Sequence, residues 1–259
     1  PIPDKDIDFS HVSGNGSAIV MLLPQYRLHP NLSVVARNLV KIFPQVDSSF
    51  RIHICRGKDS KIVDCFDKTI MGDLCALITL GKQFERLIEA VPHTFPKRRH
   101  DLAKAWPTKS MPCVLKDIHG KEHEYTIDVR GWIGTYKSTK GRKATMTDFP
   151  DNFISLYANG KMGEFNILPV VGQNKLNEVY VVGQLHVDLF ELTELPDMAL
   201  SNRQGYKSDD PRYIAVLDYV RKELLAEILR MRELFVDLNN EGKKRKRLEE
   251  QKAKEALLR

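Results

Sequence analysis

The spacing of apolar residues changes several times along the 259-residue chain. Short apolar runs, and runs in which every second residue is apolar, predict strands; we expect them over residues 18–23, 50–55, 61–66, 113–118, 124–136, 153–157 and 179–187. Apolar residues three and four positions apart predict helices; we expect these over residues 32–43, over most of 70–91, and from Pro211 onward. Together these elements predict an α+β fold, in which a mixed sheet with flanking helices is closed by a long C-terminal helix.

The helix that begins at Pro211 carries an apolar seam with alternating spacings of four and three residues. Arg221 interrupts the seam, and Val216, Val220 and Leu225 widen it. A wide stripe favours packing on the chain's own sheet over a coiled coil with a second copy, although a homodimer stays open as an alternative. The polar segment 92–107, which contains three prolines, predicts a connection between subdomains.

The cysteines and the start of the chain indicate a cytoplasmic protein. The four cysteines are far apart and form no C-x-x-C pair, which predicts reduced core thiols and no metal site; they are Cys55, Cys65, Cys75 and Cys113. No apolar run reaches the length of a membrane span, and the first residues do not resemble a signal peptide. The absence of an initiator Met favours a fragment of a longer parent protein.

The positive charge of the chain is concentrated at its end. Residues 243–259 hold eight basic and three acidic side chains, so most of the formal net charge of +6 lies there. Five adjacent cations are candidate contacts to nucleic-acid phosphates: Lys243, Lys244, Arg245, Lys246 and Arg247. On a helix they would point around the whole circumference, so a solvated helix end is the competing interpretation. No aromatic residues are interleaved, which argues against binding to single strands.

Three short motifs resemble segments of one superfamily. Gly14-Asn15-Gly16-Ser17-Ala18-Ile19-Val20 resembles the glycine–Ser/Thr turn and strand that end the ATP-binding domain of GHKL ATPases, which include gyrase B, MutL and the ninety-kilodalton heat-shock chaperones. Gly131-Trp132-Ile133-Gly134-Thr135 and Ser201-Asn202-Arg203-Gln204-Gly205 resemble segments of a bacterial branch of chaperone-like or gyrase-like ATPases. Some members of that branch act in DNA repair or in defence against phage. The likeness covers roughly residues 14 to 235.

The resemblance also implies what this chain lacks. Members of the superfamily hold ATP with an upstream helix bearing Glu and Asn, an Asp-x-Gly-x-Gly turn and a glycine-rich lid, and none of these occurs here. Because the Glu activates water and the Asn holds magnesium, we expect no catalytic residue in this chain. ATP and Mg would bind only in the intact parent, an ATP hydrolase, whose ATP-binding domain would be the partner of this chain.

The resemblance implies four segments. Residues 1–30 would be the remnant of the last strand of the ATP-binding domain, with Gly14, Gly16 and Ser17 at the nucleotide. Residues 31–109 would form a connecting α/β subdomain, residues 110–240 the transducer domain with its long helix, and residues 241–259 a basic helical tail.

A transducer of this superfamily reaches the γ-phosphate of ATP with one cationic residue on a loop. Arg203 fits that role, since Pro196 and Gly205 bracket a polar loop before the long helix and a guanidinium can grip a phosphate with two hydrogen bonds. Asn202 and Gln204 could bond the same oxygens, and Lys207 is the substitute candidate. The alternative is that Arg203 pairs with Asp209 or Asp210 at the start of the helix.

The resulting hypothesis is a non-catalytic transducer fragment of a GHKL-type ATPase, which senses the γ-phosphate and relays closure to a DNA- or partner-directed segment in DNA repair or phage defence. The alternative is a free-standing nucleic-acid- or protein-binding module with no ATP link. The loop with Lys137, Lys140, Arg142 and Lys143 is interpreted as a solvated hairpin tip, or as a second place for a DNA contact. His186, on an apolar strand, is predicted to be a core residue.

Overall fold

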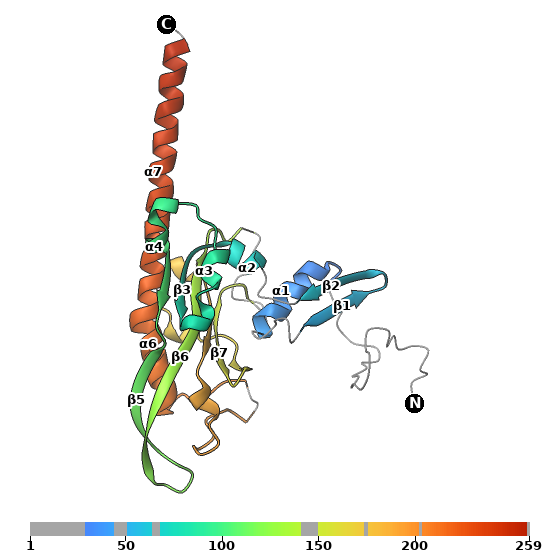
Figure 1. Ribbon diagram of the computed structural model, residues 1–259, viewed down its shortest axis with the longest axis vertical. Coiled ribbons are helices and arrows are strands. Elements are labelled where there is room, and N and C mark those ends of the chain that lie inside the picture. Colours follow the sequence, from blue (N-terminus) through green and yellow to red (C-terminus); the bar gives the residue numbers. More distant parts are fainter. Residues whose placement is uncertain are drawn as a thin grey trace.

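The computed structural model describes residues 29–43, 51–63, 68–140, 150–173, 176–201 and 204–257. Within them, the centre of the fold is a seven-stranded mixed sheet with the order β4-β3-β6-β9-β7-β8, in which β5 pairs with β6 outside this path. A long helix lies against the sheet and continues far beyond it (Figure 1). The predicted α+β fold, with a mixed sheet closed by a long C-terminal helix, is confirmed.

The sheet contains both parallel and antiparallel pairs. β3 runs parallel to β4, and β7 runs parallel to β9, whereas the other neighbouring strands are antiparallel. A separate hairpin of β1 (Ile52–Arg56) and β2 (Asp59–Val63) lies in the segment where the alternation predicts one. The strands of the sheet are β3 (Leu74–Leu80), β4 (Ala103–Trp106), β5 (Lys109–Lys116), β6 (Glu122–Tyr136), β7 (Phe153–Ala158), β8 (Lys161–Glu164) and β9 (Val181–His186).

The long strand β6 has two roles. Its first half pairs with β5 as a two-stranded ribbon, and its second half lies between β3 and β9. Where the two halves of β6 meet, Gly131 has a φ of 131°, and a Cβ there would lie 2.1 Å from the carbonyl oxygen of Gln184. A side chain at this position would therefore clash with the neighbouring strand, which gives the first glycine of the Gly-Trp-Ile-Gly-Thr motif a structural reason.

Helices cover both faces of the sheet (Figure 1). One face carries α6 (Pro211–Tyr219), a π-helical turn η6 (Val220–Leu224) and α7 (Leu225–Leu257), which follow one another without a break. The other helices are α1 (Leu32–Ile42), α2 (Lys68–Gly72), α3 (Leu87–Ala90), α4 (Arg99–Leu102) and α5 (Leu168–Val171), with 3₁₀ turns η2 (Lys82–Phe84), η3 (Pro96–Arg98), η4 (Leu176–Tyr180) and η5 (Asp188–Glu191).

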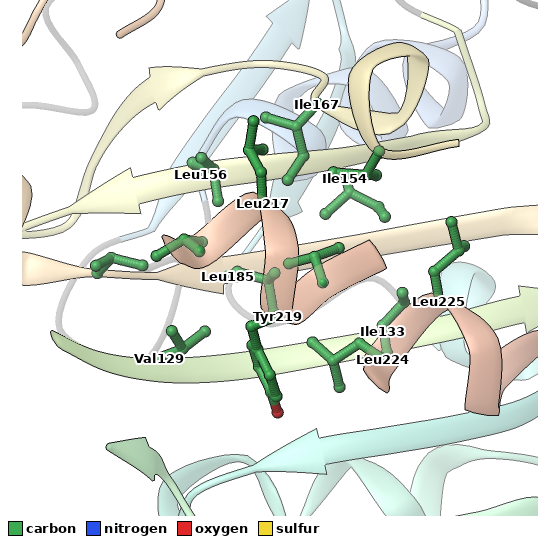
Figure 2. Packing of buried hydrophobic residues seen from close by; sticks show 14 of the residues in the cluster. Val129, Ile133, Ile154, Leu156, Ile167, Leu185, Leu217, Tyr219, Leu224 and Leu225 are labelled. Atoms are coloured by element: carbon green, nitrogen blue, oxygen red, sulfur yellow. The ribbon is translucent and has the colours of Figure 1, made fainter. Parts of the chain in front are cut away.

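Two apolar cores lie on the two faces of the sheet. Figure 2 shows the first, in which Leu217, Leu224 and Leu225 of the long helical run pack on side chains from β6, β7 and β9. The wide apolar stripe thus packs on the chain's own sheet, as predicted. The second core joins α1, α2 and α3 to the opposite face, where Trp132 is fully buried.

A buried polar network fixes α1 to the sheet. The ammonium of Lys41, which is only 2% exposed, lies 2.8 Å from a carboxylate oxygen of Asp151. Gln184 donates its amide to the carbonyls of Val40 and Lys41, and the Tyr157 hydroxyl donates to the Lys41 carbonyl at 2.6 Å. These bonds satisfy carbonyls that the end of a helix leaves unpaired, so α1 and the sheet are held as one unit.

The structure corrects two predicted elements. Residues 70–91 are not mostly helical, because Leu74–Leu80 forms the fully buried strand β3. A continuous apolar run has no periodicity that separates a central strand from a buried helix. Residues 92–107 are more than a connection, since they contain α4 and β4, which pairs with β3. β3 and β4, from the expected segment 31–109, therefore share one sheet with β6 from segment 110–240.

Candidate functional site

The loop that precedes the long helix is closed on itself. An isolated antiparallel bridge joins Ala199 to Tyr206, and the N–H of Leu200 donates to the carbonyl of Gly205 at 2.9 Å. Lys207 donates from its backbone to Met198 and from its ammonium to the carbonyl of Asp197, both at 2.8 Å. The base of the loop is thus fixed, and its tip around Ser201 and Gln204 is exposed.

Two of the predicted sensor residues, Gln204 and Lys207, lie among the described residues. Asn202 and Arg203 lie outside the described residues, and Gln204 is exposed beside them. Lys207, the substitute candidate, is exposed as well, but its ammonium donates to its own loop. Lys207 therefore serves to close the loop in this structure. Gly14, Gly16 and Ser17, the residues expected at the nucleotide, also lie outside the described residues.

A partly buried acid, Glu164, lies beneath the loop, and the sequence analysis missed it. The carboxylate of Glu164 accepts hydrogen bonds from the Tyr213 hydroxyl, at 2.9 and 3.0 Å, and from the backbone N–H of Tyr206. Burial raises the pKa of Glu164, and these hydrogen bonds offset part of that increase. Glu164 thereby connects β8 to the base of the loop and to the first turn of α6.

A second missed residue, Arg212, secures the start of the helix. Its guanidinium donates to both carboxylate oxygens of Asp210, at 2.9 and 2.7 Å, and to the carbonyl of Pro196 at 2.8 Å. Asp210 also accepts from the backbone N–H of Arg212 as the N-cap residue of α6. Burial of Asp210 opposes its ionisation, but the hydrogen bonds from Arg212 outweigh burial and lower the pKa of Asp210. The signal in the sequence was Asp-Pro-Arg, a cap followed by proline at the first helical position.

This arrangement bears on the alternative proposed for Arg203. Both oxygens of the Asp210 carboxylate already accept hydrogen bonds from Arg212, which is 3% exposed. Arg212 therefore provides an ion pair that caps the long helix at Asp210, and the pairing expected between Arg203 and Asp210 lies outside the described residues. Asp209 is exposed and remains as the other expected partner of Arg203.

The five cations of the basic segment lie on α7, beyond the sheet (Figure 1). Lys243, Lys244, Arg245, Lys246 and Arg247 are all exposed. Among the described residues, an ion pair reaches this segment only at Lys246, whose ammonium lies 4.0 Å from a carboxylate oxygen of Glu250. The loop at the end of β6 adds Lys137, which donates to the carbonyl of Gly72 at 3.4 Å, and the exposed Lys140, whereas Arg142 and Lys143 lie outside the described residues.

The histidine and most of the cysteines that the sequence analysis placed in the core can also be located. His186 is largely buried between the rings of Phe84 and Tyr157, and burial lowers its pKa to about 4. Cys75 is a buried core residue as predicted, but Cys55 is exposed on the hairpin, which corrects that prediction; Cys65 lies outside the described residues. Among the described residues there is no group of three or more His, Cys, Asp or Glu side chains that could hold a metal ion. No helix in the same residues is long and apolar enough to cross a membrane.

The comparisons with known proteins give one partial likeness. No family model matches the chain, and no solved structure matches it at a significant level. Over 105 residues, the chain is 32% identical to a protein of Herpetosiphon aurantiacus described as "Putative type II restriction enzyme HgiDII". The match covers 39% of this chain and 16% of that protein, so the chain spans a small part of the relative's length.

Proposed function

We propose that this chain is a non-catalytic transducer of a GHKL-type ATPase that acts on DNA. The observation that carries the proposal is the unbroken helical run from Pro211 to Leu257, which begins at the closed loop and ends in the basic segment. At about 1.5 Å per residue, this run is about 70 Å long. A change at the loop would therefore be passed along a rigid element to the far end.

In this proposal the loop senses the nucleotide. ATP and Mg bind to a separate ATP-binding domain, and Arg203 reaches the γ-phosphate with help from Asn202 and Gln204. The GHKL likeness of residues 201–205 supports this role. The fixed base of the loop supports it further, because a sensor must transmit displacement to the helix that follows.

The opposite end of the run is directed at DNA. Exposed cations with few acidic partners bind phosphates without sequence preference. The likeness to a protein named as a restriction enzyme supports a DNA substrate, and a context of defence against foreign DNA agrees with both resemblances.

The name of the similar protein mentions restriction and not ATP. This likeness therefore also favours a second candidate, a DNA-binding module with no ATP link. The two candidates differ in one measurable property. In the first, ATP turnover by the complete protein depends on the loop, and in the second no substitution in the loop affects any ATPase.

The test combines this chain with its ATP-binding domain, in one polypeptide or as separate chains. Arg203→Ala should lower ATP turnover roughly a hundredfold, because one charge-assisted contact to developing phosphate charge is lost. The melting temperature should stay nearly constant, as for a surface substitution. Arg203→Lys should restore part of the turnover, since it keeps the charge and loses the two-pronged grip.

Arg212→Ala is the matched control in the same loop region. It leaves Asp210 partly buried without its partner, so it should lower the melting temperature whether or not the loop senses ATP. If Arg203→Ala lowers the melting temperature and leaves turnover unchanged, Arg203 is structural and the sensor role is wrong.

A further inference from the structure

The long helix loses contact with the sheet at a defined point. Phe235 packs edge-on against Phe95, with ring centroids 5.7 Å apart, and Leu238 is the last apolar residue of α7 in that small cluster. From Glu241 to Lys252 every residue is exposed. Arg247 lies 12 residues beyond Phe235, so the basic segment overhangs the sheet by about 18 Å.

The direction in which each cation points can be read from the residue about five helical turns earlier in α7. A helix has about 3.6 residues per turn, so residues about 18 positions apart point the same way. Lys243, Lys246 and Arg247 therefore share the directions of three side chains that are buried against the sheet, namely Leu225, Ile228 and Leu229. These three cations face the side of α7 on which the sheet lies, above its end. Glu249 and Glu250 follow them on the same side, since they share the directions of buried Met231 and Arg232.

Lys244 points elsewhere. It is three and seven positions from Glu241 and Asp237, which are exposed, so the three residues share one face of α7. That face is mixed in charge and turned away from the sheet. Hence the five adjacent cations are not equivalent, although they are neighbours in the sequence.

The end of β6 lies beside α7 just before the overhang and leads to a further lysine. Buried Arg232 of α7 donates to the carbonyl of Tyr136, the last residue of β6, which places the end of β6 beside the last packed turns of the helix. Lys140 follows four residues later, within about 14 Å along the chain at full extension. It is exposed.

A third segment, η3–α4, completes this surface. α4 lies beside α7 (Figure 1). The segment packs against α7 through Leu102 and through the Phe95–Phe235 contact. Lys97 is exposed and Arg99 half-buried, and among the described residues neither has a carboxylate within ion-pair distance. The neighbouring Asp101 is held by Arg98 at 2.5 Å, which leaves the positive charge of this segment in excess.

We infer that the overhang of α7 and the end of the sheet form one basic corner that seats the phosphate backbone of double-stranded DNA. The corner consists of Lys243, Lys246, Arg247, Lys97, Arg99 and Lys140. Duplex DNA carries one charge per about 1.7 Å of axis, so an overhang of about 18 Å can face several phosphates. The aromatic rings at this end, Phe95 and Phe235, are packed on each other and offer no platform for unpaired bases.

This inference rests on the DNA-directed part of the proposed function and adds the body of the protein to the contact. It also separates contributing from non-contributing cations within the basic segment. A tail that binds alone would use all five cations and none from the sheet end. In the corner, cations of α7 and cations at the end of the sheet both contact the DNA, and Lys244 does not.

The test measures binding of the 259-residue chain to a labelled duplex of about 20 base pairs, by fluorescence anisotropy between about 50 and 200 mM salt. The tail variant carries Lys243→Glu, Lys246→Glu and Arg247→Glu, and the body variant carries Lys97→Glu and Lys140→Glu. Each lost phosphate contact should reduce the slope of log K against log salt by about 0.9. We expect a reduction of about 2 to 3 for the tail variant and about 1 to 2 for the body variant.

Lys244→Glu is the control, and it should leave the slope within about 0.5 of the parent value. Melting curves establish that each variant is folded. A body variant with unchanged slope, beside a tail variant that no longer binds, would overturn the corner and leave the tail contact standing. Absence of duplex binding by the unaltered chain would overturn both the corner and the DNA-directed role. Equal competition by poly-glutamate would assign the corner to an acidic protein instead.

Discussion

The two halves of the long helical run show how one element can be formed for different reasons. In the first half, from Pro211 to Phe235, one side of the helix is buried, and the apolar stripe packs on the sheet. In the second half, residues 241–252 are exposed all round and have no apolar stripe. The second half is helical because its Lys, Arg, Glu and Gln residues favour helix and because the packed half supplies the costly nucleus. Packing thus fixes the first half, and propagation extends it into solvent.

The largest expected effect is on the free energy of unfolding, when a leucine is replaced by alanine in each half of the helical run. Leu224→Ala removes a fully buried side chain and leaves a cavity against the sheet, so it should lower the free energy of unfolding by about 2 to 5 kcal/mol. Leu248→Ala removes a side chain that is 53% exposed and should change it by less than about 0.5 kcal/mol. Urea unfolding measures both. Equal effects would mean that the projecting half packs on something in solution.

A smaller effect depends on pH. Hydrogen bonds from Arg230, opposed by burial and assisted by Lys104, lower the pKa of Glu227 to about 2. A lowered folded-state pKa means that the stabilisation is present above the unfolded-state pKa, about 4.5, and is lost as the pH falls toward 2.

Glu227→Gln should therefore lower the free energy of unfolding by about 1 to 2 kcal/mol at pH 7, after allowance for solvent screening, and by almost nothing near pH 2. Glu249→Gln, in the projecting half, is the control and should show no such pH dependence. Urea unfolding curves at a series of pH values measure the difference in free energy of unfolding between each variant and the parent. A deficit of Glu227→Gln that persists at pH 2 would contradict an electrostatic origin.

The smallest effect concerns the helix beyond the sheet. Gly242 lies within α7, and a Cβ added there would meet no atom within 4 Å. Gly242→Ala should therefore stabilise the local helix by about 0.5 to 1 kcal/mol and slow amide hydrogen exchange at residues 243–247 about two- to fivefold. The melting temperature of the sheet should not change. Faster exchange in the variant would show that the helix is interrupted at this glycine in solution.

The candidate site was only partly accessible from the sequence. The exposed cations of residues 243–247 and the polar loop before Pro211 can be found from composition and turn signals. Arg212 and Glu164 could not be found in this way, because their role depends on partners at Pro196, Tyr206 and Tyr213 that only the fold brings together. The role of Arg203 stays a prediction.

The role of the motif Gly131-Trp132-Ile133-Gly134-Thr135 likewise depends on partners that only the fold brings together. As a sequence it resembles a segment of other proteins, whereas in the structure Trp132 and Ile133 fill opposite cores and Gly131 allows close approach of β9. β3 shows the converse case, since its seven apolar or small residues gave no periodicity and were expected within a helix. Only pairing with β4 and β6 decides that this run is a strand.

The sequence by itself determined the fold class, most strands and the start of the long helix, because alternation, caps and wide apolar stripes are local signals. The tertiary structure alone decided the identity of β3, the buried pairs Lys41–Asp151 and Arg212–Asp210, and the directions in which adjacent cations point. Burial and ion pairing depend on residues far apart in the chain, and the direction of a helical side chain has meaning only once one side of the helix is packed.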